Sequence, residues 1–181
     1  VVSAASSLVA VHNGIVANPE ELWALAGKTT ELPVLDTQAL IAYYDFLTQN
    51  NNIQECYRLL YEKIEGSASL ALLNPHDNRL SLSTNTGSLY YVMNKDKTSL
   101  FFASEILFLD EILDDLQVQR SSIKYLSPSH AILVNKDGMQ NFNFTDKASY
   151  GDLQSAGELN GDLISNDYSA PVSKSEAKNL Y

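Results

Sequence analysis

Apolar residues recur along this chain with two different spacings, and the spacing changes near residue 66. Before that point they fall three or four positions apart, as on one face of an α-helix. This spacing predicts helices at residues 18–26, 37–49 and 53–64. An apolar run at residues 7–12 precedes them and is typical of a strand.

Beyond residue 66, polar and apolar residues alternate, as in strands with one buried face. The predicted strands cover residues 67–73, 79–84, 89–93, 99–104, 131–135 and 139–144, with a further helix at residues 104–113. Turns rich in Asn, Asp and Gly join several of them, which favours antiparallel neighbours. Helices followed by such a meander predict an α+β fold with a mainly antiparallel sheet.

Composition sets the size of the domain and excludes some partners. The chain has 181 residues, of which 45% are apolar, enough for the core of one domain. Residues 145–181 are rich in Ser, Asp, Asn and Gly, so we expect a domain at residues 1–144 and a polar tail or linker after it. A formal charge of -10 argues against binding to nucleic acid or to an anionic membrane surface.

Most of the candidate chemistry in the sequence is weak. The three histidines, His12, His76 and His130, are far apart, and no glycine-rich phosphate loop is present, so we expect neither a metal nor another cofactor. The single cysteine, Cys56, excludes an intrachain disulfide and is compatible with the reducing cytoplasm. It falls on the apolar face of a predicted helix, where a thiol is buried and unreactive.

Two short segments carry more specific chemistry. A strand that ends at Asn13-Gly14 presents an amide side chain and a bare backbone N–H, the donors of an oxyanion hole, although an ordinary Asn-Gly turn explains the same residues. Asp36-Thr37 begins a helix, where either residue caps the helix or the carboxylate pairs with a ligand ammonium group. Taken alone, each segment favours the structural explanation.

Taken together and in order, several segments are more specific. They read VHNGIVANPEELW, LDTQALIAYY, EGSASLALL, LSTNTGSLYYVM and LFFASEI. This series resembles the class II glutamine amidotransferases, which are N-terminal-nucleophile hydrolases, over roughly residues 7–144. The first segment looks most like the glutaminase domains of glucosamine-6-phosphate synthase and amidophosphoribosyltransferase. FFASEI and the later SPSHAILVNKDG look more like asparagine synthetase.

The resemblance implies a fold, a reaction and a site. The fold is a four-layer αββα sandwich. The reaction releases ammonia from glutamine for an acceptor on a synthase domain or partner subunit, and the resemblance is also compatible with an oligomer. Asn13 and Gly14 match the family's oxyanion-hole residues. Asp36 matches the aspartate that holds the α-amino group of glutamine. Thr37 orients that loop, and His12 is assigned with them to substrate binding.

The sequence also departs from the family pattern. Val1 stands where the family's nucleophilic cysteine is expected, and the arginine-bearing segment that binds the glutamine carboxylate is absent. Thr84-Asn85 replaces a frequent Arg-Asp pair, and Gln38 replaces a glutamate. Two explanations are open. Either the nucleophile lies on a segment before Val1, or the chain is a degenerate, non-catalytic module for binding or assembly.

Overall fold

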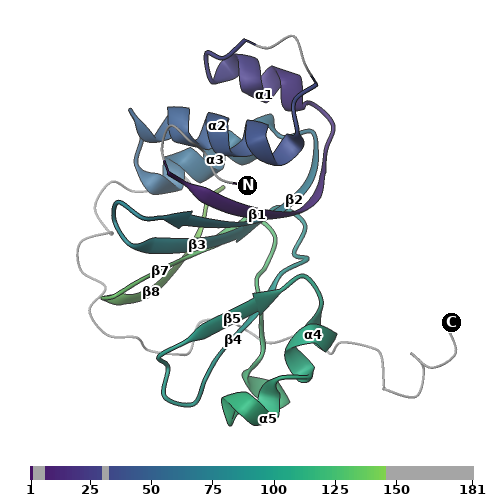
Figure 1. Ribbon diagram of the computed structural model, residues 1–181, viewed down its shortest axis with the longest axis vertical. Coiled ribbons are helices and arrows are strands. Elements are labelled where there is room, and N and C mark those ends of the chain that lie inside the picture. The colour runs from purple at the N-terminus through teal and green to yellow at the C-terminus, as the bar shows by residue number, and fades with distance from the viewer. Residues whose placement is uncertain (2–6, 30–32, 146–181) are drawn as a thin grey trace, which may run out of the picture. The chain divides into compact units, whose positions relative to one another are not determined.

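The computed structural model describes residues 1, 7–29 and 33–145, which form two sheets between two layers of helices (Figure 1). The helices are α1 (Pro19–Leu25), α2 (Asp36–Thr48), α3 (Ile53–Lys63), α4 (Ile106–Asp110) and α5 (Leu113–Leu116). The strands are β1 (Val9–Val16), β2 (Gly66–Asn74), β3 (Arg79–Thr84), β4 (Tyr90–Met93), β5 (Leu100–Ala103), β6 (Lys124–Tyr125), β7 (His130–Asn135) and β8 (Gly138–Asn143). The predicted tail lies outside the described residues.

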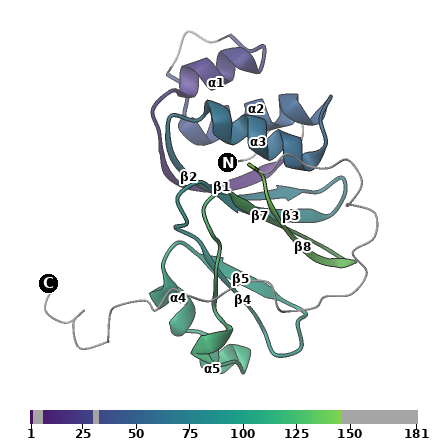
Figure 2. The ribbon, with the colours of Figure 1, turned by 180° about the vertical axis from the view of Figure 1, so that it is seen from behind.

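All described strand pairs are antiparallel. One sheet has the order β1-β2-β3-β7-β8 (Figure 2). The other has the order β5-β4-β6. In the larger sheet β1 is therefore an edge strand, since β2 is its only neighbour among the strands described. This position leaves one row of backbone groups on β1 available to something other than the sheet.

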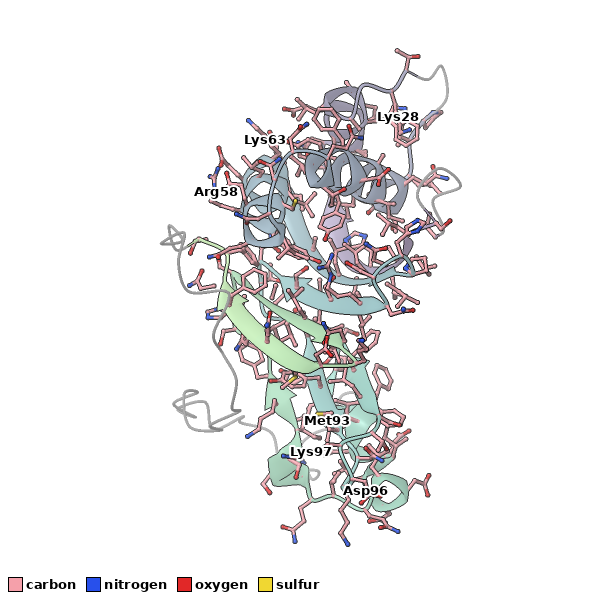
Figure 3. All side chains as sticks on the ribbon, turned by 90° about the vertical axis from the view of Figure 1, so that its left-hand side faces the viewer. Lys28, Arg58, Lys63, Met93, Asp96 and Lys97 are labelled. Atoms are coloured by element: carbon pink, nitrogen blue, oxygen red, sulfur yellow. The ribbon has the colours of Figure 1, made fainter. Side chains whose placement is uncertain are left out.

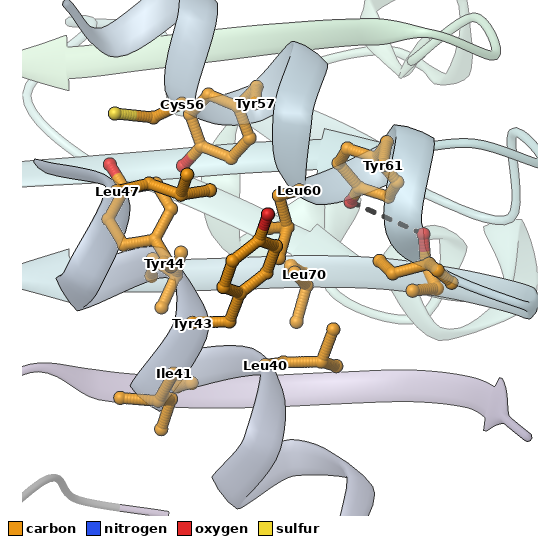
Figure 4. Packing of buried hydrophobic residues seen from close by; sticks show 14 of the residues in the cluster. Leu40, Ile41, Tyr43, Tyr44, Leu47, Cys56, Tyr57, Leu60, Tyr61 and Leu70 are labelled. Carbon is orange, nitrogen blue, oxygen red and sulfur yellow. Dashed lines mark hydrogen bonds between the residues drawn. The ribbon is translucent and has the colours of Figure 1, made fainter. Parts of the chain in front are cut away.

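Three apolar clusters define the layers. The first joins α2 and α3 to one face of the larger sheet, with Leu40, Leu60 and Leu70 among its members (Figure 4). The second lies between the two sheets and includes Leu82 and Tyr91. The third packs the smaller sheet against α4 and α5 and comprises Val92, Leu109, Leu116 and their neighbours. The layer order is α, β, β, α, which confirms the predicted sandwich.

Several charged side chains lie on the outside of these layers. Figure 3 shows Arg58 and Lys63 on α3, and Asp96 and Lys97 in the turn between β4 and β5. Arg58 pairs with two acids of its own helix, at 2.6 and 2.7 Å. No helix in the described part of the chain is long and apolar enough to cross a membrane.

The helix predicted at residues 104–113 is wrong in its extent, because the structure divides the region into α4 and α5. A continuous helix would bring Asp110 close to Asp114, and Glu111 close to Asp115. Like charges four residues apart destabilise a helix by about 0.2–0.5 kcal/mol a pair, so these acids oppose a continuous helix. The short strand β6 had no signal in the sequence, since two residues show no periodicity.

Cys56 lies on α3 with no exposed surface, as predicted. Burial raises the pKa of its thiol to about 11, so almost no thiolate forms at neutral pH. We expect Cys56→Ala to cost about 1 kcal/mol of stability or a little more, measured by denaturant unfolding, because it removes only one small buried group. Rapid alkylation of native Cys56 at neutral pH would contradict this description.

Candidate functional site

Strand β1 continues through Asn13-Gly14, so the turn predicted there is wrong. The pairing with β2 runs without interruption from Val9, opposite Leu73, to Val16, opposite Gly66. Gly14 adopts a φ of 144°, and a Cβ atom at this position would overlap the carbonyl oxygen of Ser67. Glycine is therefore needed here for close approach between strands rather than for chain reversal.

The backbone N–H of Gly14 points away from β2. Its partner Ala68 uses both of its own backbone groups on Asn85: the N–H donates to Asn85 Oδ1 at 2.9 Å, and the carbonyl accepts from the Asn85 N–H at 3.2 Å. Opposed residues of an antiparallel pair direct their backbone groups either toward each other or both outward. Since Ala68 faces Asn85, Gly14 directs its N–H to the outer edge of β1.

A second observation agrees with this direction. Ala10 lies four residues before Gly14 on β1, so its backbone groups point to the same side of the strand. It exchanges two backbone hydrogen bonds with Val1, each 2.9 Å long. The backbone groups of odd-numbered residues point toward β2 instead. The N–H of Ala17, for example, donates to the Glu65 carbonyl at 2.7 Å. The outer edge of β1 can therefore receive hydrogen-bonding groups.

Asn13 lies beside this N–H with its side chain on the other face of the strand from His12. Asn13 is exposed, and its partner across the ladder is Ser69, which is opposite Thr84 in turn. Ser69 and Thr84 share a hydrogen bond of 2.8 Å between their hydroxyl groups. A polar row thus crosses three strands next to Asn13.

The loop after β3 is fixed against this row. Thr84 Oγ1 accepts the N–H groups of Thr86 and Gly87 at 3.2 and 2.9 Å, and Asn85 Nδ2 donates to the Gly66 carbonyl at 3.0 Å. In the sequence, Thr84 and Asn85 stand out only as departures from a family pattern. Here they hold the loop close to the start of β2, where Ala68 is the register partner of Gly14.

Asp36 and Thr37 form the first turn of α2. The N-cap position is Leu35, with no side-chain capping bond, so the predicted capping role is wrong. Instead, Asp36 Oδ1 accepts the Thr37 N–H at 2.6 Å and the Thr37 hydroxyl at 3.2 Å. A carboxylate at a helix N-terminus is also favoured by the helix dipole. The Asp36 side chain keeps 33% of its surface exposed, so a ligand can reach it.

His12 connects β1 to this turn. Its Nδ1 lies 3.5 Å from Asp36 Oδ2 and 3.4 Å from Thr37 Oγ1, and its side chain is only 3% exposed. The structure thus brings three of the five predicted site residues into contact. That Asn13 and Gly14 act on the same ligand as Asp36 stays a prediction. Of the other histidines, His76 is exposed in a turn, and no group of metal ligands occurs among the described residues.

The sequence of this sandwich matches a known domain. The family model described as "glutamine amidotransferase domain" matches residues 1–111. The chain belongs to the glutamine amidotransferase domain family. This amidotransferase domain has no match among curated protein sequences.

Solved structures share the fold of this amidotransferase domain. Glutamine phosphoribosylpyrophosphate amidotransferase from B. subtilis, complexed with ADP and GMP, is similar over 78% of this chain, with a TM-score of 0.57 and 17% identity. An allosteric regulatory enzyme of purine biosynthesis is similar over 76%, with a TM-score of 0.55 and 16% identity. A class-II glutamine aminotransferase domain protein from Silicibacter pomeroyi gives a TM-score of 0.51 at 14% identity over 76%.

The likeness to these solved structures confirms the predicted class of fold. The amidotransferase domain spans only 30% and 28% of the first two proteins and 67% of the third.

Proposed function

We propose that this domain is the glutaminase half of a glutamine-dependent amidotransferase. It binds glutamine, its chemistry yields glutamate and ammonia, and the ammonia passes to an acceptor on another domain or subunit. The observation that carries the proposal is the outward N–H of Gly14 beside the exposed amide of Asn13, on a strand that His12 connects to Asp36.

Asn13 and Gly14 are suited to stabilise the oxyanion formed when the glutamine amide is attacked. The Asn13 side chain and the Gly14 N–H both donate hydrogen bonds, and negative charge develops on the amide oxygen in the transition state. The pairs Asn13–Ser69 and Ile15–Ser67 flank Gly14 and fix its peptide plane. Donors held in this way need little reorganisation during the reaction.

Asp36 supports recognition at the other end of the substrate. Glutamine carries its ammonium group several bonds away from its side-chain amide, so a site for it needs an acceptor for each end. The partly exposed Asp36 carboxylate is an acceptor for the ammonium group. Thr37 occupies one of its oxygens and leaves lone pairs on the other.

The chain's own thiol is unsuited to attack glutamine. Cys56 is fully buried on α3, and its raised pKa keeps it protonated. We therefore assign the nucleophile to a residue outside those described. In such a reaction the nucleophile forms an acyl-enzyme, ammonia leaves, and water releases glutamate.

Asp36→Asn tests the assignment of the ammonium site. We expect glutamine affinity to fall about tenfold or more, because a charge-assisted hydrogen bond becomes a neutral one. In a polypeptide that carries the nucleophile, the change should appear mainly in KM, since the contact exists in ground and transition states alike. Calorimetric titration with L-glutamine measures it, and Asp45→Asn on the same helix is the control. Unchanged affinity in Asp36→Asn would refute the assignment.

A further inference from the structure

His12 is a buried imidazole with one engaged nitrogen and one unused nitrogen. Its side chain is 3% exposed, and Nδ1 faces Asp36 Oδ2 and Thr37 Oγ1 at 3.5 and 3.4 Å. Nε2 is buried and has no hydrogen-bond partner in the part of the chain that the structure describes. Buried polar atoms without partners are uncommon, so this arrangement needs a reason other than packing.

The surroundings of Nδ1 indicate which nitrogen carries the proton. The Thr37 hydroxyl is placed to donate to Asp36 Oδ1, at 3.2 Å, and so presents its oxygen lone pairs to other groups. Asp36 Oδ2 is an acceptor as well. If Nδ1 were unprotonated, a third lone pair would face these two oxygens. A proton on Nδ1 instead gives the imidazole an acceptor to donate to and leaves Nε2 bare.

We propose that His12 is a positioning residue, which donates from Nδ1 to Asp36 and sets the orientation in which that carboxylate receives the ammonium group of glutamine. The inference rests on the proposed function. It makes the predicted role of His12 in substrate binding an indirect one, which acts through Asp36. His12 is too deeply buried to be offered to the ligand itself, whereas Asp36 keeps a third of its side chain exposed.

The contacts around Asp36 show why an orienting group is useful. Thr37 holds Oδ1 through its N–H and hydroxyl groups, both from the same turn of α2. A carboxylate held at one oxygen can still swing about that contact. His12 approaches Oδ2 from β1 and thereby ties the carboxylate to the strand that carries Asn13 and Gly14. The acceptor for one end of the ligand is then fixed relative to the donors for the other end.

Two substitutions at position 12 separate this role from packing. In His12→Asn the amide nitrogen takes about the place of Nδ1, whereas in His12→Gln it takes about the place of Nε2. We expect His12→Gln to weaken L-glutamine binding about tenfold, and His12→Asn to stay within about threefold of the wild type, although Asn leaves the larger cavity. Calorimetry on the full chain gives both affinities, and circular dichroism checks the fold of each variant.

A second ligand identifies the group that His12 serves. The amide of glutaric acid has the carboxylate and side-chain amide of glutamine but no α-amino group. Its affinity should change little in either variant, because Asp36 has no ammonium group to receive. An equal loss of both ligands in His12→Gln would mean that the substitution disturbs the site in general, and it would overturn the inference.

The tautomer provides a test that needs no variant. Long-range ¹H–¹⁵N spectra of the wild-type chain should show His12 protonated at Nδ1 and bare at Nε2. Protonation at Nε2 in a chain that binds glutamine would overturn the inference and leave the proposed function intact. A wild-type chain that does not bind glutamine would overturn the proposed function, and the ligand role of His12 with it.

Discussion

Asn13→Ala is expected to lower glutaminase turnover roughly 10²-fold or more, in the polypeptide that carries the nucleophile. The Asn13 amide is exposed beside the outward N–H of Gly14, where it can donate to the oxyanion. Because that charge exists only in the transition state and the intermediate, kcat should fall far more than glutamine affinity. Steady-state release of ammonia measures the effect.

The matched control for this substitution is Asn141→Ala. Asn141 is also exposed and lies on β8, at the opposite edge of the same sheet. Its removal should leave turnover within about twofold of the wild type, as expected for a surface change away from the site. Equal turnover in the two variants would show that Asn13 is an ordinary strand residue.

Gly14→Ala is expected to destabilise the domain by about 2–4 kcal/mol. Two costs add at this position. The φ of 144° is a conformation that L-residues rarely adopt, and the added Cβ would overlap the carbonyl oxygen of Ser67. Urea unfolding should show a lower midpoint, and the shift measures the sum of the two costs.

Gly138→Ala separates the two costs. Gly138 has a similar φ of 136° at the start of β8, just after the turn from β7, but a Cβ there would meet no atom within 4 Å. It should therefore lose only the conformational part, about 1 kcal/mol. If both variants are destabilised to the same extent, the close approach of Gly14 to β2 does not restrict this position.

The sequence predicted the regular elements well where periodicity was long. The helices expected at residues 37–49 and 53–64 match α2 and α3 to within a residue, and the strand at residues 79–84 matches β3. These elements are long, or they alternate cleanly, so that one face must be buried. The prediction of one helix in the region of α4 and α5 was wrong in its extent. The apolar spacing there is helical, but pairs of acids oppose a continuous helix.

Asn13-Gly14 shows why local propensity was insufficient. The pair is a strong turn signal, but pairing with β2 extends on both sides of it and keeps the chain straight. Tertiary hydrogen bonds therefore outweighed the local preference. The identities of the candidate site residues came from the resemblance, whereas the direction of the Gly14 N–H follows only from the register.

The contact of His12 with Asp36 could not be derived from the sequence. It depends on α2 beginning beside the edge strand, and no spacing within the chain encodes that placement. The polar row through Ser69 and Thr84 was only weakly indicated by the sequence. Both are polar residues inside alternating strands, and both proved to be buried.

The most direct test of the account is a titration of the ¹⁵N-labelled wild-type chain with L-glutamine, followed at the Gly14 backbone amide and the Asn13 side-chain amide. A single glutamine site at this edge of the sheet predicts saturable shifts at both amides, with the same dissociation constant as a shift at the Thr37 amide, which is bonded to Asp36. Shifts confined to other parts of the chain, or shifts at Thr37 with none at Gly14, would contradict a single glutamine site at this edge of the sheet.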